Sequence, residues 1–241
     1  MKILISTPIC DVKNYCWAEY YTALNNMIDP AGYEFSLHIV DSSDKPSQKI
    51  VDQLEAIKYP TSYEWVNAEK PMDKVVKARN AIFEYAIVGG FSHVLFVDSD
   101  VIVEPDTFTR LLSALARHDP NWSVVTGNYL VTTPNGFPTP AAKLWTKIGW
   151  MNFPESHLDG TIHEVDMTGL GCTLIPRRIF EIFGFRCLRL SGEVVASEDM
   201  EFFRDLQTQT FRIKPIKVLY DTSINFKHLV GGDFSWDRKT A

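Results

Sequence analysis

The chain has 241 residues, of which 45% are hydrophobic and 22% charged, and its formal net charge is −6. This is the composition of a soluble globular protein with a large core, and it lacks the basic character of a nucleic-acid-binding domain, so no nucleic-acid partner is expected. The four cysteines have no zinc-site or disulfide spacing, and no apolar run predicts a secretion signal or a transmembrane segment, so a cytoplasmic location with reduced thiols is expected.

The first half of the chain alternates between strand and helix patterns, which is typical of a parallel sheet built from βαβ units. Short apolar runs predict strands at 2–6, 34–40, 62–66 and 93–97. Apolar residues at helical spacing predict helices at 14–28, 47–57 and 72–87, and Pro105 opens a further helix.

The second half has a mixed pattern. Strands are predicted at 122–131 and on both sides of a glycine turn within 161–176, and short strands at 216–220 and 223–229. Helices are predicted at 177–184 and 197–208, and the proline-rich segment 132–142 is predicted as a loop. Together the two halves predict a single α/β domain with a mostly parallel central sheet flanked by helices, and a site at the carboxyl ends of its parallel strands.

Two aspartates, Asp98 and Asp100, close the fourth predicted strand in "VLFVDSDVIVEP". Alternate residues of an extended chain point the same way, so both carboxylates can face one ligand. Oxygen ligands suit Mg²⁺ and Mn²⁺, and a cation with a diphosphate would explain two acids at the end of a buried strand. The alternative is a solvated turn that caps the next helix.

Three further positions carry chemistry that the pattern alone leaves open. Arg79 can pair with a phosphate through its fork of donors, or it is a surface charge on a helix. In "SEDMEFF", Ser197 suits a helix N-cap and the acids Glu198 and Asp199 suit the positive end of a helix; alternatively, one acid is a general base. His228 precedes a Gly-Gly turn and is either structural or a metal ligand.

The segments "ILISTPI", "VDSSD", "KARNAIFEYA", "VLFVDSDVIVEP", "GLGCTLIPRRIFEIFGF" and "SEDMEFF" occur in an order that resembles the nucleotide-sugar-dependent glycosyltransferases of the GT-A fold, in particular their family 2-like inverting branch. The resemblance covers residues 2–230. It implies one GT-A (Rossmann-like) domain over 1–241, with a nucleotide-binding half at 1–104 and an acceptor and catalytic half at 105–241. The chain lacks the "QxxRW" motif, which argues against a processive polysaccharide synthase.

The resemblance implies donor-binding roles for several matching positions. Thr7, Pro8 and Asp41 match the residues that hold the nucleoside. Asp44 competes with Asp41 for this role, and a turn-capping role is the alternative for Asp41. Two further matching positions contact the donor. Arg79 matches the helix arginine, and Asp98 matches the first acid of the DxD motif.

The resemblance also implies a metal site, a sugar pocket and a base. Asp100 matches the metal ligand, with Asp98 beside it and His228 as a closing ligand, for Mn²⁺ or Mg²⁺. Gly169 and Gly171 match a glycine segment that shapes the donor-sugar and acceptor pocket, although tight turns alone also explain these two glycines. Asp199, in preference to Glu198, matches the general base.

The implied activity is a metal-dependent transfer of a hexosyl group from a UDP- or GDP-sugar to an acceptor hydroxyl, with inversion at the anomeric carbon. The sequence does not identify the acceptor, although Trp145, Trp150 and Trp236 are candidates for stacking on sugars or for core packing. A nucleotidyltransferase that makes nucleotide sugars is one alternative, but the stretch "STPICDVKNY" has no glycine-rich phosphate loop. A catalytically inactive nucleotide- or carbohydrate-binding module is another, and the intact acids argue against it.

Overall fold

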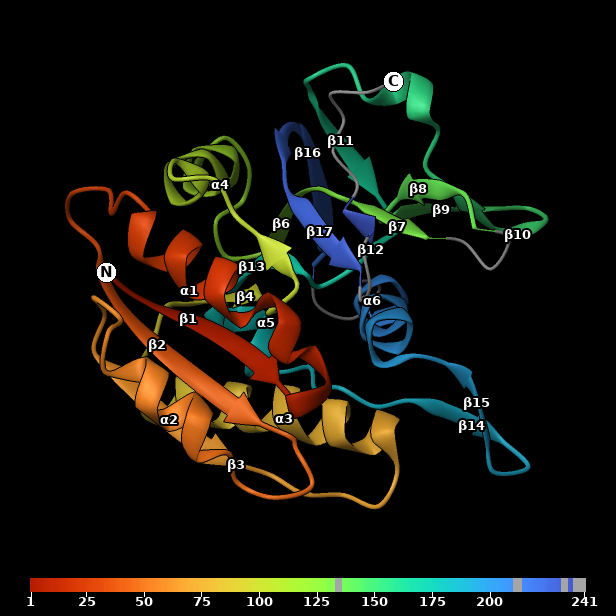
Figure 1. The fold of residues 1–241 in the computed structure, drawn as a ribbon. Helices are drawn as coiled ribbons and strands as arrows, with labels where there is room; N and C mark the ends of the chain where they lie inside the picture. The colour runs from red at the N-terminus through yellow and green to blue at the C-terminus, as the bar shows by residue number, and fades with distance from the viewer. Residues whose placement is uncertain (133–135, 210–213, 231–233, 236–241) are drawn as a thin grey trace.

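A computed structural model describes residues 1–132, 136–209, 214–230 and 234–235, and its centre is an eight-stranded sheet (Figure 1). The strands lie in the order β11-β16-β6-β13-β4-β1-β2-β3. Their bounds are β11 (Ile162–Val165), β16 (Lys217–Asn225), β6 (Ser123–Asn128), β13 (Cys172–Pro176), β4 (His93–Val97), β1 (Lys2–Ile9), β2 (Glu34–Asp41) and β3 (Thr61–Trp65).

The sheet is mostly parallel and confirms the predicted fold class. Strand β1 pairs in parallel with β2 and β4, β2 with β3, and β6 with β16. Strand β13 is antiparallel to both β4 and β6 and joins the two halves of the sheet, while β11 forms an antiparallel edge. All residues of β4 are buried, which explains why the strand is apolar from Val94 to Val97.

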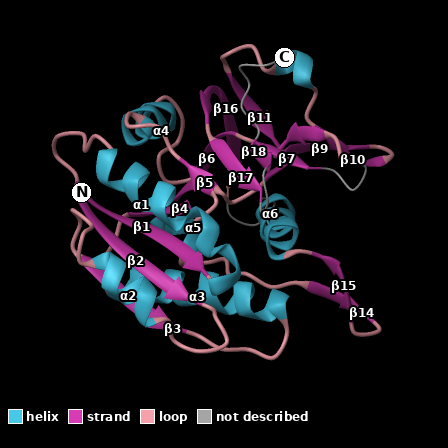
Figure 2. Ribbon diagram, viewed as in Figure 1, coloured by secondary structure: helices cyan, strands magenta, loops and turns pink. Residues whose placement is uncertain are grey.

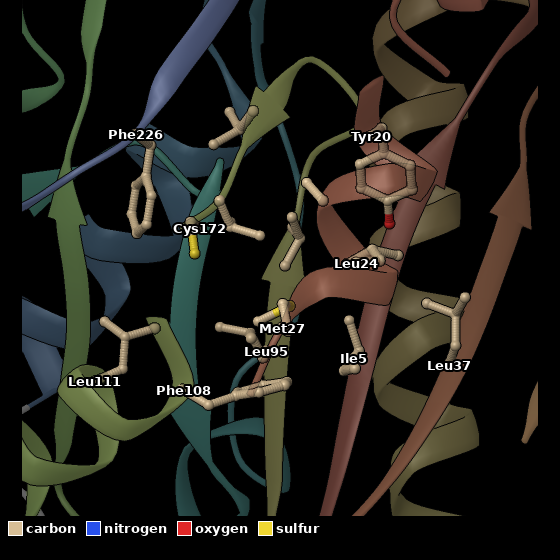
Figure 3. Close-up of a cluster of buried hydrophobic side chains, with 14 of the residues drawn as sticks. Ile5, Tyr20, Leu24, Met27, Leu37, Leu95, Phe108, Leu111, Cys172 and Phe226 are labelled. Carbon is tan, nitrogen blue, oxygen red and sulfur yellow. The ribbon is translucent and has the colours of Figure 1, made fainter. Parts of the chain in front are cut away.

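Helices cover both faces of the sheet (Figure 2). One face packs against α1 (Trp17–Asn26), α2 (Gln48–Leu54) and α4 (Thr107–Ala116). The other packs against α3 (Pro71–Val88), α5 (Arg177–Phe180) and α6 (Glu198–Gln209). Figure 3 shows part of the first core layer, where Ile5 and Leu95 of the sheet lie among Leu24 of α1 and Phe108 of α4.

Short strands and turns surround the carboxyl end of the sheet. Two 3-10 helices, η1 (Asp11–Cys16) and η2 (Glu155–His157), lie in loops. The small sheets comprise β10 (Gly149–Asn152), β9 (Ala142–Thr146) and β12 (Met167–Thr168); β14 (Leu188–Leu190) and β15 (Glu193–Ala196); β18 (Phe234–Ser235), β17 (Lys227–Val230) and β5 (Val101–Ile102); and β7 (Leu130–Thr132) and β8 (Pro138–Pro140).

Several sequence-based boundaries are corrected by the structure. The helix predicted at 14–28 begins as η1 and becomes α-helical only at Trp17, and the helix predicted at 177–184 ends at Phe180. The predicted loop 132–142 contains β8, because Pro138 and Pro140 lie on a short two-stranded ribbon where proline is tolerated. The hairpins β9–β10 and β14–β15 were not predicted.

No helix in the described part of the chain is long and apolar enough to cross a membrane. The four cysteines are all free thiols, as expected from their spacing.

Candidate active site

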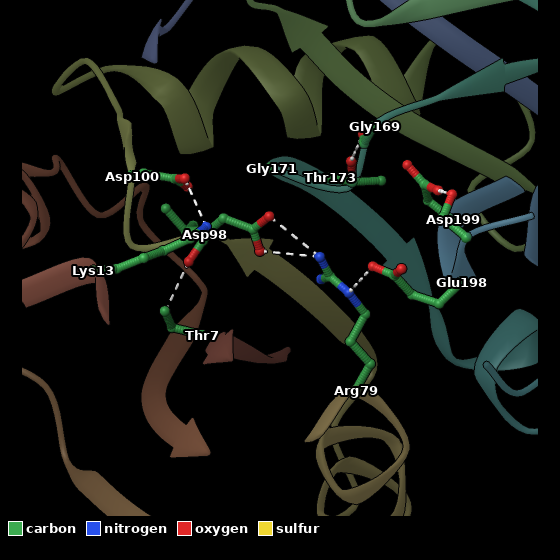
Figure 4. A network of polar contacts seen from close by, with 12 residues as sticks. Thr7, Lys13, Arg79, Asp98, Asp100, Gly169, Gly171, Thr173, Glu198 and Asp199 are labelled. Atoms are coloured by element: carbon green, nitrogen blue, oxygen red, sulfur yellow. Dashed lines mark hydrogen bonds and ion pairs between the residues drawn. The ribbon is translucent and has the colours of Figure 1, made fainter. Parts of the chain in front are cut away.

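The predicted site residues gather where β4 ends, beside the start of α6 (Figure 4). Asp98 directly follows β4, and its backbone N–H donates to the carbonyl of Gly171 at 2.8 Å. Asp100 lies just before β5, and its carbonyl accepts from the N–H of Leu229 at 2.7 Å. Backbone pairing therefore fixes both acids against segments from the second half of the chain.

Arg79 of α3 connects two carboxylates. Its Nη2 lies 3.2 Å from both oxygens of Asp98, and its Nε lies 3.2 Å from Oε1 of Glu198. The guanidinium is buried and faces the ring of Phe96 at 5.0 Å and that of Phe185 at 6.0 Å. Burial opposes its charge, but the two carboxylates outweigh burial and raise the pKa of Arg79, so the arginine stays charged.

Asp100 has a lysine and a histidine as neighbours. The Nζ of Lys13, from η1, lies 2.6 Å from Oδ2, and Nε2 of His228 lies 3.5 Å from the same oxygen. Burial opposes ionisation of Asp100, but the hydrogen bond from His228 and the charge of Lys13 together hold its pKa below the usual range. Burial likewise opposes the charge of His228, but Asp100 outweighs it and raises the pKa of the imidazole.

The structure does not bring Asp98, Asp100 and His228 together around one point. Asp98 faces Arg79, whereas Asp100 faces Lys13 and His228, and no three His, Cys, Asp or Glu side chains cluster as a metal site within the described ranges. In this arrangement the two acids have different partners, and the cation site expected from Asp98, Asp100 and His228 stays a prediction.

Asp100 and His228 still form a donor pair that suits Mn²⁺ or Mg²⁺. Nδ1 of His228 lies 3.0 Å from the carbonyl of Leu130, which holds the proton on Nδ1 and leaves Nε2 directed at Asp100 when the ring is neutral. The carboxylate oxygen would suit either cation, whereas the imidazole nitrogen would suit Mn²⁺ better than the harder Mg²⁺.

The two acids at the start of α6 have different surroundings. Glu198 is buried against Arg79; burial and the neighbouring carboxylate of Asp199 raise its pKa, while Arg79 opposes the rise. Asp199 is half-buried, and its Oδ1 accepts hydrogen bonds from Ser197 Oγ and from the N–H of Met200, the latter at 2.7 Å. Asp199 is thus oriented by its own helix turn and has no cationic side chain bonded to it in the described structure, whereas Glu198 is engaged by Arg79.

The predicted glycines are explained by a tyrosine that the sequence did not single out. A Cβ at Gly169 would collide with the hydroxyl of Tyr129, and one at Gly171 would lie 2.8 Å from Val101 and 2.9 Å from the Tyr129 ring. The N–H of Gly171 donates to the Tyr129 hydroxyl at 3.1 Å, and the tyrosine ring meets the ring of His228 edge-on at 5.6 Å. Tyr129 thus connects the glycine segment to the candidate metal ligand.

The nucleoside candidates lie at the ends of β1 and β2. Thr7 is buried and bonds to Tyr20 and to the carbonyl of Val97, whereas Pro8 is half-buried. The carboxylate of Asp41 accepts from the N–H groups of residues 43 and 47 and from the hydroxyl of residue 63, at 2.6–3.0 Å, which are the contacts of a loop-capping acid. Asp44 is exposed and paired with Lys74.

Sequence reasoning missed Lys13 as well as Tyr129. Lys13 lies in a polar stretch after β1 without any motif, and only the turn of η1 brings it to Asp100. Of the tryptophan candidates, Trp145 and Trp150 face each other across β9 and β10, and Trp236 lies outside the described residues.

The chain resembles known proteins in its sequence profile and in its fold. The sequence profile of the family described as "Glycosyltransferase like family 2" matches residues 24–220. No curated protein matches the sequence. Similar solved structures include TarS residues 1–349 from S. aureus in complex with UDP-GlcNAc, with 18% identity and a TM-score of 0.59 over 91% of this chain and 58% of that one.

Two other solved structures are also similar in fold. GalNAc-T7 with UDP, GalNAc and Mn²⁺ has 13% identity and a TM-score of 0.66, covering 95% of this chain and 44% of that one. A197 from STIV has 16% identity and a TM-score of 0.51, covering 95% of this chain and 86% of that one. The chain thus spans just over half of the TarS fragment and less than half of the GalNAc-T7 chain. At these identities the likeness concerns the fold alone.

Proposed function

Because the chain belongs to the glycosyltransferase-like family 2 and has the GT-A fold, we propose that it is a metal-dependent glycosyltransferase. It transfers a hexosyl group from a UDP- or GDP-sugar to an acceptor hydroxyl, with inversion at the anomeric carbon. The observation that carries the proposal is the convergence of Asp98 and Asp100, at the end of β4, with Glu198 and Asp199 at the start of α6. This arrangement offers a diphosphate site beside a carboxylate that can take a proton.

The nucleotide lies across the carboxyl ends of β1, β2 and β4. Thr7, Pro8 and Asp41 shape the nucleoside end, where Asp41 acts by holding its loop rather than by direct contact. Asp98, held by Arg79, lies near the ribose. Because Arg79 is already paired with two carboxylates, its role is to orient Asp98 and Glu198 around the donor.

The diphosphate lies beside Asp100 and His228. These two residues would hold a Mn²⁺ or Mg²⁺ ion, which supplies positive charge to the leaving nucleoside diphosphate. Lys13 supports the same end of the site, because its ammonium group is already 2.6 Å from Asp100 and can turn to a phosphate oxygen. Gly169 and Gly171 have no side chain and so leave room for the sugar next to Tyr129.

Asp199 acts as the general base. Its carboxylate takes the proton from the acceptor hydroxyl while the hydroxyl oxygen attacks the anomeric carbon. The bond between that carbon and the diphosphate oxygen breaks on the opposite side, and the electron pair leaves with the diphosphate. Ser197 and the N–H of Met200 fix one carboxylate oxygen, which leaves the other for the acceptor. Glu198 is unsuited to this role because it is paired with Arg79.

The test is Asp199→Asn, compared with Asp205→Asn on the same helix, where Asp205 pairs with Arg186 at 2.6 Å. Calorimetric titration with UDP and GDP, with and without Mn²⁺, measures donor-site binding, and release of nucleotide from a panel of UDP- and GDP-sugars measures turnover. Asp199→Asn should bind nucleotide like the wild type and lose turnover by a factor of about 10² or more, while Asp205→Asn keeps both. Full turnover in Asp199→Asn would reject the base, and absence of UDP and GDP binding to the folded wild type would reject the function.

A further inference from the structure

A cavity lies between the β9–β10 hairpin and α6, and its lining includes none of the acids of the candidate active site. Its volume is about 390 Å³. The lining combines two indole rings with four polar side chains, from Trp145, Trp150, Asp166, Arg204, Gln207 and Thr208. We propose that this cavity binds a neutral saccharide unit of the acceptor, so that the acceptor is a glycan or carries one. The inference rests on the proposed glycosyltransferase function.

The aromatic side of the cavity is a tryptophan pair. Trp145 and Trp150 are directly opposite each other in the antiparallel hairpin, with ring centroids 4.9 Å apart at 74°. The edge-on contact fixes the orientation of both indoles. Trp145 is nevertheless 61% exposed, so much of its surface is in contact with solvent rather than the core. A fixed, exposed indole beside a cavity is suited to the apolar C–H face of a pyranose ring.

The polar side of the cavity supplies both donors and acceptors. Asp166 Oδ2 accepts a hydrogen bond from the backbone N–H of Trp145 at 2.7 Å, and Gln207 Nε2 lies 3.4 Å from the backbone carbonyl oxygen of Asp166. Arg204 is held by the buried Glu201. The lining carries one carboxylate and one guanidinium, the latter already paired with Glu201, and their remaining hydrogen-bonding capacity matches hydroxyl groups, which donate and accept. A neutral polyol fits this lining better than an anion or a cation does.

The cavity borders α6 on the C-terminal side of the candidate base, Asp199. Arg204, Gln207 and Thr208 recur at helical spacing, so they lie on one side of the helix. At about 1.5 Å of rise per residue, Arg204 lies about 8 Å along the helix axis from Asp199. Figure 1 shows α6 beside the β12, β9 and β10 strands, so the helix borders both sites. In this proposal an acceptor oligosaccharide places one unit against Trp145 and reaches around the first turns of α6 to bring the hydroxyl of another to Asp199.

A lipid surface is the main competing occupant, because the tip of the same hairpin carries Ile148, which is 95% exposed. Ile148 does not line the cavity, so it separates the two cases. A saccharide depends on Trp145 and not on Ile148, whereas insertion of the hairpin into a membrane depends on both.

The experiment compares wild type, Trp145→Ala, Trp145→Phe and the control Ile148→Ser. Each protein is applied to a printed array of glycans, to vesicles of phosphatidylcholine and phosphatidylglycerol, and to UDP and GDP with Mn²⁺ in a calorimeter. We expect glycan binding by wild type and Ile148→Ser, loss by at least about tenfold in Trp145→Ala, partial recovery in Trp145→Phe, and the same nucleotide affinity in all four.

Three results would overturn the inference: no glycan bound by folded wild type, unchanged glycan binding in Trp145→Ala, or vesicle binding that both Trp145→Ala and Ile148→Ser abolish. Glycan binding that depends on Trp145 in a protein that binds neither UDP nor GDP supports the saccharide site and rejects only the transferase function.

Discussion

Arg79 and Glu198 are 119 positions apart in the chain, yet Nε of Arg79 lies 3.2 Å from Oε1 of Glu198. The same guanidinium holds Asp98, so one side chain joins α3, the end of β4 and the start of α6. Because Asp199 follows Glu198 directly, the position of the candidate base depends on this ion pair. Both sides of the active site are therefore set by an arginine that need not touch the substrate.

Replacement of Arg79 should destabilise the whole domain. Arg79→Met leaves the carboxylates of Asp98 and Glu198 without their buried partner, and removal of one member of a buried ion pair typically costs about 3–5 kcal/mol. We expect a loss of this size in the free energy of unfolding, measured by urea denaturation. The matched control is Arg117→Met, since Arg117 is exposed and bonds only within its own helix turn in the described structure. Equal stability of the two variants would contradict the proposed role.

When no nucleotide is bound, Lys13 should weaken the binding of a divalent cation at Asp100. Its ammonium group lies 2.6 Å from the carboxylate that is the candidate metal ligand, so a divalent ion must displace it or share Asp100 with it. We expect Lys13→Gln to bind Mn²⁺ at least about tenfold more tightly, which corresponds to about 1.4 kcal/mol. Titration followed by electron paramagnetic resonance of free Mn²⁺ gives the affinity directly.

The control for this measurement is Lys217→Gln, which makes the same change of charge next to Glu164. It should leave the Mn²⁺ affinity unchanged. Weaker Mn²⁺ binding in Lys13→Gln than in the wild type would show that Lys13 does not compete for the site.

The glycine segment should be sensitive to a single methyl group. In Gly169→Ala the new Cβ meets the Tyr129 hydroxyl, and overpacking of this kind typically costs about 1–3 kcal/mol. Removal of the hydroxyl in Tyr129→Phe should relieve part of the collision, so the double variant should be more stable than the sum of the two single changes predicts. Urea denaturation of the four proteins measures this coupling. Strict additivity would show that the two residues do not press on each other.

Acid should destabilise the protein through His93, at the start of β4. Burial, opposed by the carbonyl of Pro120, lowers the pKa of His93 from 6.5 to about 4. The unfolded chain therefore binds more protons between these values, so this contribution is complete above pH 6.5 and is lost as the pH falls towards about 4. It amounts to about 3 kcal/mol. His93→Gln should flatten the unfolding free energy across this range, while His118→Gln, at an exposed position, should not.

The sequence predicted the sheet well because its strands are local patterns. Strands β1, β2 and β4 are buried apolar runs, and the glycosyltransferase resemblance follows their polar ends in order. The fold class and the family are confirmed on this basis. Asp98, Arg79 and the start of α6 all belong to motifs of the sequence, but the ion pairs of Arg79 with Asp98 and Glu198 were not predicted.

Other features depend on contacts that no local pattern encodes. Lys13 reaches Asp100 only because η1 turns the chain back over the end of β4, and Tyr129 matters only because its ring packs under the glycine segment. The β9–β10 hairpin lacks a regular alternation, and it is stabilised by the cross-strand contact between Trp145 and Trp150. The sequence also did not predict that Asp98 pairs with Arg79 while Asp100 pairs with Lys13.

The antiparallel strand β13 has a consequence for how the chain is made. It pairs with β4 from Cys172 onwards, opposite Val97, so the strand that carries the DxD motif gains its second neighbour only after most of the chain has left the ribosome. Until then β4 is an exposed edge that is apolar from Val94 to Val97, which is a template for pairing with other chains. A fragment that ends at residue 104 would keep this edge permanently and would aggregate rather than bind nucleotide as an independent half.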